Sequence, residues 1–348
     1  MKISILLPYK ENFSPSYPGA ISIFLKDIIL KSIYKKDITV YGSTKFKKKL
    51  TNNYVNLNFK KTFFKSSTKL YLNKFIEKEI KNKSDIIEVH NRPKYIFKLS
   101  KFFNNLVLFF HNDPLDMENS KSDTDRIKLI NNTKKIIFNS NWTKKRFLLN
   151  LKLDKFQKKK IQVIHQSTNK IKISLNNKKN NIIFVGRLNR SKGYDVFGKT
   201  IVKVLDKYDN WNAMVMGDET REKLFFKHKN LRIFGFKTHD FILKTLAKSQ
   251  ICVVCSRWEE PFGRIALEAS SRGCAVIITN KGGLKEAATN PLIINKLNEK
   301  TLYNAINRLI SNNNLRKKLQ KKSLSNFYLT NEFISKKIDT YRKVIVKS

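Results

Sequence analysis

Short runs of apolar residues recur along the chain, and longer stretches with helical spacing separate them. In the first half these runs cover residues 3–8, 38–43, 54–59, 86–91, 106–112, 135–140 and 161–167. Between the first two runs, residues 17–33 place apolar side chains at the spacing of one helix face. Nearly continuous apolar strands that alternate with helices are typical of a parallel sheet covered on both faces.

A polar, basic and Asn-rich segment at residues 166–181 interrupts this alternation. The pattern then restarts, with apolar runs at residues 181–187, 211–218, 231–236, 250–256, 274–280 and 291–295. We therefore expect an N-terminal domain of residues 1–168 and a C-terminal domain of residues 169–330. The simplest architecture is α/β, with two doubly wound parallel-sheet (Rossmann-like) domains facing across a cleft and ligands at the carboxyl ends of the strands.

The last segment, residues 331–348, has the apolar spacing of an amphipathic helix. It is expected to pack back on the N-terminal domain, and the alternative is a helix that lies on a lipid surface. No run approaches the ~18 apolar residues of a spanning helix, and the first apolar run is too short for a signal peptide. We expect a cytoplasmic protein, with peripheral contact to the inner face of the cytoplasmic membrane left open.

Charge is the most unusual property of the 348-residue chain, which carries 71 Lys and Arg against 27 Asp and Glu, a net charge of +44. Such a chain attracts phosphate-rich partners, whether nucleic acid or an anionic membrane surface. An AT-rich genome would also enrich Lys, Asn and Ile together and explains the excess equally well. Since no nucleic-acid-binding motif is present, we expect no specific nucleic acid partner.

Two short patterns have the spacing of metal ligands. Cys252 and Cys255 form "CVVC" inside an apolar run, which favours a buried strand because no second ligand pair exists. "SDTD" at residues 122–125 has a D-x-D pattern, but a helix start capped by Ser122 explains it better. We expect no metal site.

The stretch "FVGRLNRSKGYD" has the features of a phosphate-binding turn. A strand is predicted to end at Val185, Gly186 allows a sharp turn, and a helix begins near Gly193. Arg187 and Lys192 would supply cations to a diphosphate beside free backbone N–H groups. A basic surface turn remains the alternative.

The stretch "SRWEEPFGRIALEASSRG" is predicted to join a strand to a helix through a loop. Glu260 precedes the helix and Glu268 lies inside it, where their carboxylates can accept hydrogen bonds from sugar hydroxyls. The positive helix end would present the N–H groups of Gly263, Arg264 and Ile265. A solvated position is the alternative for Glu268. In the following strand-end loop, Gly282 and Gly283 would allow a ligand to approach the backbone closely.

The five histidines differ in their predicted settings. His90 and His111 each end a predicted strand and would point into the cleft. His165, near the linker, fits a structural role equally well. His228 and His239 are expected on the surface.

Together, "VGRLNRSKGYDV", "GFKTHD" and "CSRWEEPFGRIALEASSRGCAVIITNKGGLKE" resemble the retaining GT-B glycosyltransferases of family 4, which use nucleotide-sugar donors. The resemblance is specific over residues 181–290 and looser in the first half. It implies that Glu260 contacts the donor sugar and Glu268 the ribose. It further implies that Arg187 and Lys192 bind the diphosphate.

The same resemblance implies roles for further residues. The backbone around Phe262, Gly263, Arg264 and Ile265, with Gly186 nearby, would lie against the sugar and phosphates, and Gly235, Phe236 and Lys237 would lie near the base. The loop "SPSYPGAIS", with Gly19, would approach the donor phosphate. His111 would contact the transferred sugar and join Glu260, Arg187 and Lys192 as catalytic residues. His90 and Arg92 are expected on the acceptor side.

The resulting hypothesis is a retaining glycosyltransferase that moves a sugar from a nucleoside-diphosphate sugar to a glycan or lipid-linked acceptor. The resemblance implies no cofactor beyond the donor and no metal. Synthesis of lipopolysaccharide or another cell-envelope polysaccharide is the expected setting, with an anionic membrane surface as a further partner. The alternatives are a basic nucleic-acid-binding protein and a GT-B enzyme of another reaction, such as a sugar epimerase.

Overall fold

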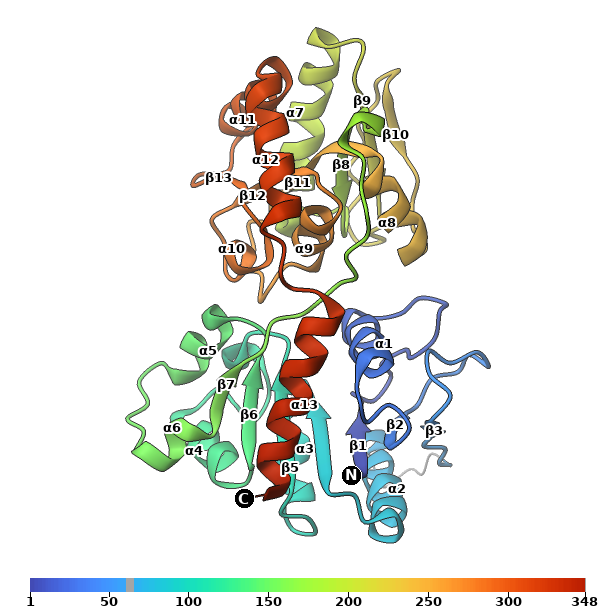
Figure 1. Ribbon diagram of the computed structural model, residues 1–348, viewed down its shortest axis with the longest axis vertical. Helices are drawn as coiled ribbons and strands as arrows, with labels where there is room; N and C mark the ends of the chain where they lie inside the picture. Colours follow the sequence, from blue (N-terminus) through green and yellow to red (C-terminus); the bar gives the residue numbers. More distant parts are fainter. Residues whose placement is uncertain (61–65, 348) are drawn as a thin grey trace. The chain divides into compact units, whose positions relative to one another are not determined.

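A computed structural model describes residues 1–60 and 66–347, and these form two compact units (Figure 1). Unit 1 comprises Met1–Ser167 together with the C-terminal segment from Asn331. Unit 2 comprises Thr168–Thr330. The boundaries expected from the sequence, after residues 168 and 330, lie within one residue of these divisions.

Unit 1 is built on a seven-stranded sheet in the order β3-β2-β1-β4-β5-β6-β7, and every pairing in it is parallel. The strands are β1 (Ile3–Leu6), β2 (Ile38–Gly42), β3 (Tyr54–Asn56), β4 (Ile86–His90), β5 (Leu106–Phe110), β6 (Lys135–Phe138) and β7 (Ile161–Val163). Each of the seven apolar runs in the first half contains one of these strands. The prediction of a parallel α/β sheet is therefore confirmed.

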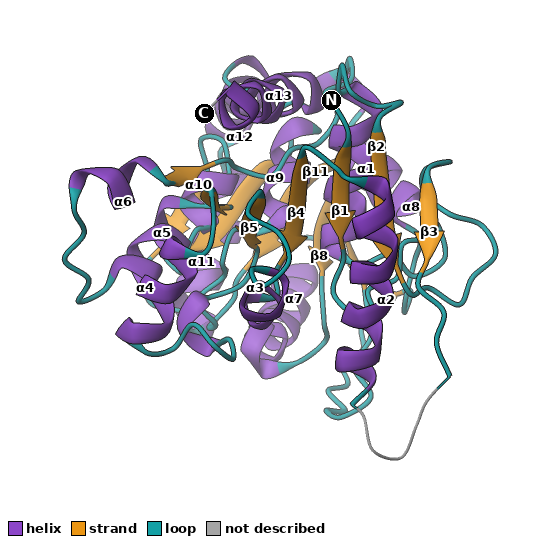
Figure 2. Ribbon diagram, turned by 90° about the horizontal axis from the view of Figure 1, so that it is seen from below, coloured by secondary structure: helices purple, strands orange, loops and turns teal. Residues whose placement is uncertain are grey.

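Helices cover both faces of this sheet. They are α1 (Ala20–Lys31), α2 (Ser67–Asn82), α3 (Pro93–Leu99), α4 (Asp123–Asn131), α5 (Asn141–Leu148), α6 (Lys155–Lys159) and α13 (Asn331–Lys347), with a short 3-10 helix at Pro114–Asp116. One core cluster joins α2, α3, α4 and α5 to one face. Helix α13 packs against α1 and β4 and lies on the opposite side of the strands from α2 and α3 (Figure 2).

Unit 2 is built on a six-stranded parallel sheet in the order β10-β9-β8-β11-β12-β13. The strands are β8 (Lys179–Val185), β9 (Asn212–Met216), β10 (Leu231–Ile233), β11 (Ser249–Val254), β12 (Ala275–Thr279) and β13 (Leu292–Ile294). Each lies in or overlaps one of the apolar runs predicted after the linker. Cys252 lies inside β11 and Cys255 directly follows it, and both are buried free thiols, which confirms the strand interpretation of "CVVC".

The helices of unit 2 also form two layers. They are α7 (Tyr194–Lys207), α8 (His239–Ala247), α9 (Arg264–Ser271), α10 (Leu284–Ala287), α11 (Glu299–Ser311) and α12 (Asn313–Ser325), with 3-10 turns at Leu175–Asn177 and Arg190–Lys192. Helices α7 and α11 share one core cluster with the inward-facing residues of the sheet. Helices α8, α9 and α12 contact β11 or β12. The two stretches that were expected to bind the donor therefore begin in loops at the carboxyl ends of β8 and β11.

A buried ion pair fixes α13 to the sheet of unit 1. Arg342 donates from Nε to Glu88 Oε1 at 2.8 Å and from Nη2 to Oε2 at 2.9 Å, and neither side chain is more than 1% exposed. The Tyr341 hydroxyl donates to the same carboxylate. Asp339 accepts hydrogen bonds from Ser32, at the end of α1, and from Arg342. The bidentate geometry fixes the position of α13 on β4.

Two further sequence interpretations can be checked in the helices. Ser122 caps α4 by accepting from the Asp125 amide at 3.1 Å, which confirms the helix-start interpretation of "SDTD". Across the described part of the chain, no helix is long and apolar enough to cross a membrane.

The Glu88–Arg342 pair yields a stability prediction. We expect Arg342→Met to lower the free energy of unfolding by about 3–5 kcal/mol, because it leaves a buried carboxylate without its cation. Urea unfolding measures this, with Lys343→Met, at an exposed neighbouring position, as the matched control. A loss below about 1 kcal/mol would contradict a stabilising role for this ion pair. The double variant Glu88→Gln/Arg342→Met should be less destabilised than Arg342→Met alone, because no buried carboxylate is left without its cation.

Acid should remove the stabilisation that the Glu88–Arg342 ion pair provides. Burial by itself raises the pKa of the Glu88 carboxyl, but Arg342 outweighs it and the pKa is lowered from 4.5 to about 2. Since the folded pKa is depressed, the contribution is present above pH 4.5 and is lost as the pH falls toward 2. In urea titrations across this window, Glu88→Gln should lose less stability than the wild type. Equal losses of stability in the two proteins would argue against a contribution from the Glu88 carboxylate in this pH range.

Candidate functional site

Three loops of unit 2 meet because their strands are neighbours. The loops follow β8, β11 and β12, which lie side by side in the sheet and run in the same direction. The sheet reverses its strand order at β8 and β11, and such a switch point is where open α/β sheets bind ligands. Ser191 O accepts hydrogen bonds from the Arg257 and Trp258 amides at 2.9 and 3.1 Å, and so joins the first loop to the second.

Lys192 and Glu260 form the centre of this junction. The Lys192 ammonium makes an ion pair with Glu260 Oε1, and Ser256 donates its hydroxyl to the same oxygen. The Lys192 Nζ atom also lies 5.0 Å from the centroid of the Trp258 ring. Glu260 is only 7% exposed. A cation and a carboxylate expected at one donor site are thus in direct contact.

Glycines permit the close approach of these loops. Gly193 has φ +73°, and a Cβ on it would lie 2.0 Å from the Cys255 carbonyl oxygen. Gly282 has φ +52°, and a Cβ there would lie 2.1 Å from the Glu260 carbonyl oxygen. The Gly283 amide donates to that oxygen at 2.6 Å. The Gly282–Gly283 pair therefore approaches the backbone of the Glu260 loop, whereas the sequence had suggested a ligand.

Glu268 lies inside α9 and is completely buried. Its Oε1 atom is 2.8 Å from His239 Nε2 and 2.7 Å from Arg264 Nε. Burial by itself raises the pKa of the Glu268 carboxyl, but Arg264 and His239 outweigh it and the pKa lies below its ordinary value. The solvated alternative for Glu268 is therefore wrong. Within the described residues, Oε2 has no hydrogen-bond partner.

His239 was expected on the surface, next to the segment assigned to the base, and its contact with Glu268 was not predicted. It begins α8 and is held half-buried by Glu268, which lies 29 positions further along the chain. No local pattern announces such a contact, because it depends on α8 and α9 being neighbours in space. It brings Glu268 next to the segment Gly235–Lys237, where a nucleotide base was expected beside the ribose.

The other expected donor-site residues are distributed around this junction. Gly263, with φ +104°, precedes the first turn of α9, Phe262 is buried, and Arg264 and Ile265 open the helix. Gly235 O accepts the Gly217 amide at 2.9 Å, Phe236 is 44% exposed, and Lys237 Nζ lies 5.5 Å from the Phe241 ring centroid. Gly186 turns with φ +152°. The Arg187 side chain is exposed, and in the described part of the chain it has no hydrogen bond or ion pair.

In unit 1 the two expected histidines are in contact. They lie at the carboxyl ends of the adjacent strands β4 and β5, with His90 Nδ1 3.0 Å from His111 Nε2. Asn91 Oδ1 accepts from the His111 and Asn112 amides at 3.0 and 3.1 Å and ties the two loops together. Arg92, also expected on the acceptor side, is half-buried and donates to Asn91 O at 2.7 Å.

The surroundings of the histidine pair indicate its protonation. Burial lowers the pKa of both rings, that of His111 well below its ordinary value, so both are neutral near pH 7. Glu88 Oε2 lies 3.9 Å from His90 Nε2 and favours the proton there. In the tautomer with the His90 proton on Nε2, His90 Nδ1 accepts from His111 Nε2–H, and His111 Nδ1 carries a lone pair. That atom has no hydrogen-bond partner among the described residues.

Gly19 lies at the start of α1, where the resemblance suggested a donor phosphate. The Glu11 carboxylate accepts from the Ser22 amide at 3.3 Å and the Ser22 hydroxyl at 2.8 Å, in the first turn of α1. A Cβ on Gly19 would lie 2.1 Å from Glu11 Oε1. A carboxylate of the chain itself therefore occupies this helix start. In the described residues, no three or more His, Cys, Asp or Glu side chains gather as metal ligands.

The glycine at the first loop allows a structural test of the junction. Gly193→Ala and Gly235→Ala place the same methyl group at similar φ values, but a Cβ on Gly235 meets nothing within 4 Å. We expect urea unfolding to show a loss of about 1–2 kcal/mol for Gly235→Ala. Gly193→Ala should cost at least about 1 kcal/mol more, because the Cys255 carbonyl must move. Equal losses would mean that the loops are not held as described.

Comparison with known proteins fits this arrangement. Residues 165–325 match the family model described as glycosyl transferases group 1. An uncharacterized glycosyltransferase of Methanocaldococcus jannaschii is 34% identical over 112 residues, which are 30% of this chain and 28% of that protein. The match spans less than a third of the length of this relative and of two other curated relatives.

Solved structures resemble the chain over nearly its whole length. Anabaena HepE in complex with UDP and glucose has a TM-score of 0.76 at 16% identity, covering 99% of this chain and 100% of the other. WaaG, a glycosyltransferase involved in lipopolysaccharide biosynthesis, has a TM-score of 0.69 at 14% identity and covers 99% and 100%. The chain thus has the GT-B fold, and nearly all of unit 2 matches the glycosyl transferases group 1 family.

Proposed function

We propose that this protein is a retaining glycosyltransferase that moves a sugar from a nucleoside-diphosphate sugar to a glycan or lipid-linked acceptor. The observation that carries this proposal is the contact between Lys192 and Glu260 at the carboxyl edge of the unit 2 sheet. The contact lies inside the stretch that matches the glycosyl transferases group 1 family. A cation for phosphate and an acceptor for hydroxyls are the two groups that a nucleotide sugar requires at its scissile bond.

The leaving nucleoside diphosphate gains negative charge as the glycosidic bond breaks. Lys192, Arg187 and the N-terminus of α9 are the groups we assign to that charge, and they act by stabilising the transition state more than the bound donor. The Arg187 side chain is exposed, and among residues 1–60 and 66–347 it has no partner to give up when phosphate binds. Because Glu11 occupies the start of α1, we assign the diphosphate to unit 2 groups and give Gly19 no direct phosphate contact.

The two carboxylates take different parts of the donor in this proposal. Glu260 accepts hydroxyls of the transferred sugar, and Glu268 accepts a ribose hydroxyl through Oε2. The segment Gly235–Lys237 lies beside the base. Arg264 and His239 keep Glu268 ionised, so it accepts hydrogen bonds at neutral pH.

Retention follows, in our proposal, from attack on the same face that the diphosphate leaves. The departing phosphate oxygen takes the proton of the acceptor hydroxyl, and the sugar passes through an oxocarbenium-like state. His111, neutral and with a lone pair on Nδ1, accepts a hydroxyl of the transferred sugar, while His90 and Arg92 lie toward the acceptor. The protein's own cations and helix N-terminus neutralise the diphosphate, so the proposal requires neither metal nor cofactor.

The substrates are proposed by analogy with proteins of the same fold. HepE was solved with UDP and glucose, which makes UDP-sugars the first donors to test here. WaaG takes part in lipopolysaccharide biosynthesis, and we propose a comparable cell-envelope acceptor. The net charge of +44 supports peripheral contact with an anionic membrane surface, at the inner face of the cytoplasmic membrane.

Nucleotide binding tests the donor site directly. We expect a thermal-shift panel of UDP, GDP, ADP and their sugars to single out one nucleotide. Lys192→Met should weaken that nucleotide about tenfold to a hundredfold, because a hydrogen bond to a charged group contributes about 1.5–3 kcal/mol. Lys199→Met, at an exposed position of α7, should leave binding unchanged. If no nucleotide stabilises the wild-type chain, the donor-site proposal fails.

Product analysis separates the transferase from the alternatives. Steady release of nucleoside diphosphate that requires an acceptor supports a transferase, whereas conversion of the sugar without acceptor would identify an epimerase. A sequence preference for nucleic acid together with no nucleotide-sugar binding would support the nucleic-acid alternative. Binding to any polyanion at low salt would not, because the chain is strongly basic.

A further inference from the structure

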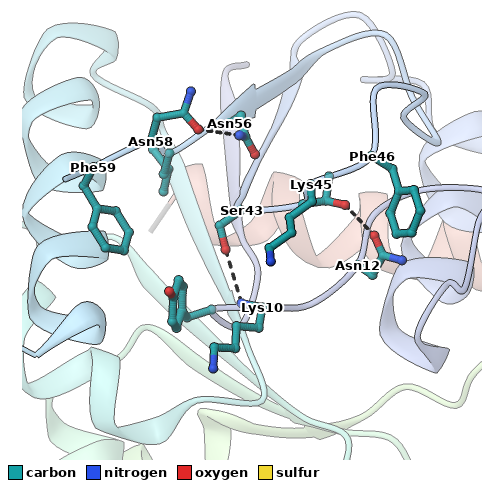
Figure 3. Close-up of a pocket in the computed structure, with 11 residues that line it drawn as sticks. Lys10, Asn12, Ser43, Lys45, Phe46, Asn56, Asn58 and Phe59 are labelled. Carbon is teal, nitrogen blue, oxygen red and sulfur yellow. Dashed lines mark hydrogen bonds between the residues drawn. The ribbon is translucent and has the colours of Figure 1, made fainter. Parts of the chain in front are cut away.

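A cavity of about 870 Å³ opens at the carboxyl edge of the unit 1 sheet (Figure 3), and neither His90 nor His111 lines it. Its lining residues come from segments 9–12, 43–46 and 56–59, which follow β1 and β2 and include the end of β3. These three strands are neighbours in the sheet, so their loops form one continuous wall. The volume lies in the range of small-molecule sites.

The charged groups of this cavity are all positive. Lys10 and Lys45 line it, and no Asp or Glu does so among the described residues. Neither ammonium has an ion pair or hydrogen bond within residues 1–60 and 66–347, and Figure 3 shows Lys45 extending toward Ser43 and Lys10. Elsewhere in unit 1, basic residues such as Lys94 and Arg146 are paired with acids. Two cations in one concave site favour an anionic ligand.

The backbone that carries Lys10 is held in an uncommon conformation. Lys10 has φ +70°, in the left-handed region that side chains other than glycine rarely adopt. Neighbouring groups hold this turn, because the Tyr9 amide donates to the Tyr95 hydroxyl at 2.9 Å and the Lys10 amide to Ser43 Oγ at 3.2 Å. Strained positions that neighbours over-determine cluster at binding sites.

The remaining lining is suited to a sugar ring. Tyr9 and Phe59 lie with their ring centroids 5.8 Å apart and offer aromatic faces to the C–H groups of a pyranose. Asn56 and Asn58 are hydrogen-bonded to each other through their side-chain amides, as drawn in Figure 3. The Ser43 hydroxyl oxygen accepts a hydrogen bond from the Lys10 backbone amide. Among the described residues, no acceptor takes the proton of this hydroxyl. Amides and hydroxyls of this kind orient sugar hydroxyls.

We propose that this cavity binds the acceptor by an anionic group, a phosphate or a carboxylate, carried on its sugar. The inference rests on the proposed transferase function and adds the chemical class of the acceptor. Lys10 and Lys45 bind the anion, and the aromatic and amide groups bind the ring. The cavity opens at the same edge of the unit 1 sheet as His90 and His111, which follow β4 and β5.

Binding of simple sugars to the full chain tests this without any donor. Titration followed by ligand-observed NMR would compare glucose 6-phosphate, glucuronate, glucose and inorganic phosphate. We expect at least one charged sugar to bind about tenfold or more tightly than glucose and than phosphate, since charge-assisted hydrogen bonds are the strong ones. The charged sugar that binds more tightly distinguishes phosphate from carboxylate. Equal affinity for glucose and both charged sugars would overturn the proposal, and so would phosphate alone binding as tightly as either.

Matched variants locate the binding. Lys10→Met/Lys45→Met should reduce the preference for the charged sugar to less than about threefold, because both cations are lost. Lys47→Met, an exposed lysine two positions from Lys45 that does not line the cavity, should keep the full preference. If Lys47→Met lowers it as much as the double variant, the preference belongs to the general charge of the chain and the proposal is wrong.

Nucleotide binding by the same variants keeps the two proposals apart. The wild type and Lys10→Met/Lys45→Met should be stabilised equally by the preferred nucleotide, which also shows that the variant is folded. If nucleotide binds while charged sugars bind no better than glucose, the acceptor inference fails and the transferase proposal stands. If charged sugars bind selectively but no nucleotide does, the donor-site proposal fails.

Discussion

The parallel pairing of every strand in the two sheets is the constraint on which the other features depend. Because the strands of a sheet run in one direction, the segments that follow them gather at one edge. In unit 2 this gathers the loops that carry Lys192, Glu260 and Gly282. In unit 1 it gathers His90, His111 and the three segments around the basic cavity. The chemistry of each unit therefore follows from strand order as much as from the residues themselves.

Three buried carboxylates in this strongly basic chain lie against basic side chains. Glu88 is paired with Arg342, Glu268 with Arg264 and His239, and Glu260 with Lys192. Each carboxylate loses its hydration on burial, and the adjacent cation offsets that cost. For Glu88 and Glu268 the cations prevail, since the pKa of each is lowered despite burial. The Glu88 pair holds the last helix in place, whereas Glu268 retains an oxygen that has no hydrogen-bond partner among the described residues.

Close contact between loops, more than the sequence of any one loop, sets their geometry. Gly193 and Gly282 have positive φ where a neighbouring carbonyl leaves no room for a Cβ. Lys10 adopts a similar φ without being a glycine, and Ser43 and Tyr95 hold it there. The Gly282–Gly283 pair shows how such positions mislead when the chain is read alone. A glycine that permits close approach does not identify what approaches.

The sequence by itself determined the elements of this protein. All seven apolar runs of the first half and all six of the second contain or overlap strands, because strands buried on both faces are apolar at nearly every position. The linker, the start of α4 at Ser122 and the loops that follow β8 and β11 were also predictable, since turn and cap residues act locally. The tertiary structure alone decided which distant groups meet. Arg342 reaches Glu88 across 254 positions, His239 reaches Glu268, and Glu11 fills the first turn of α1. Such contacts depend on strand order and helix packing, and neither of these produces a periodic pattern of residues in the sequence.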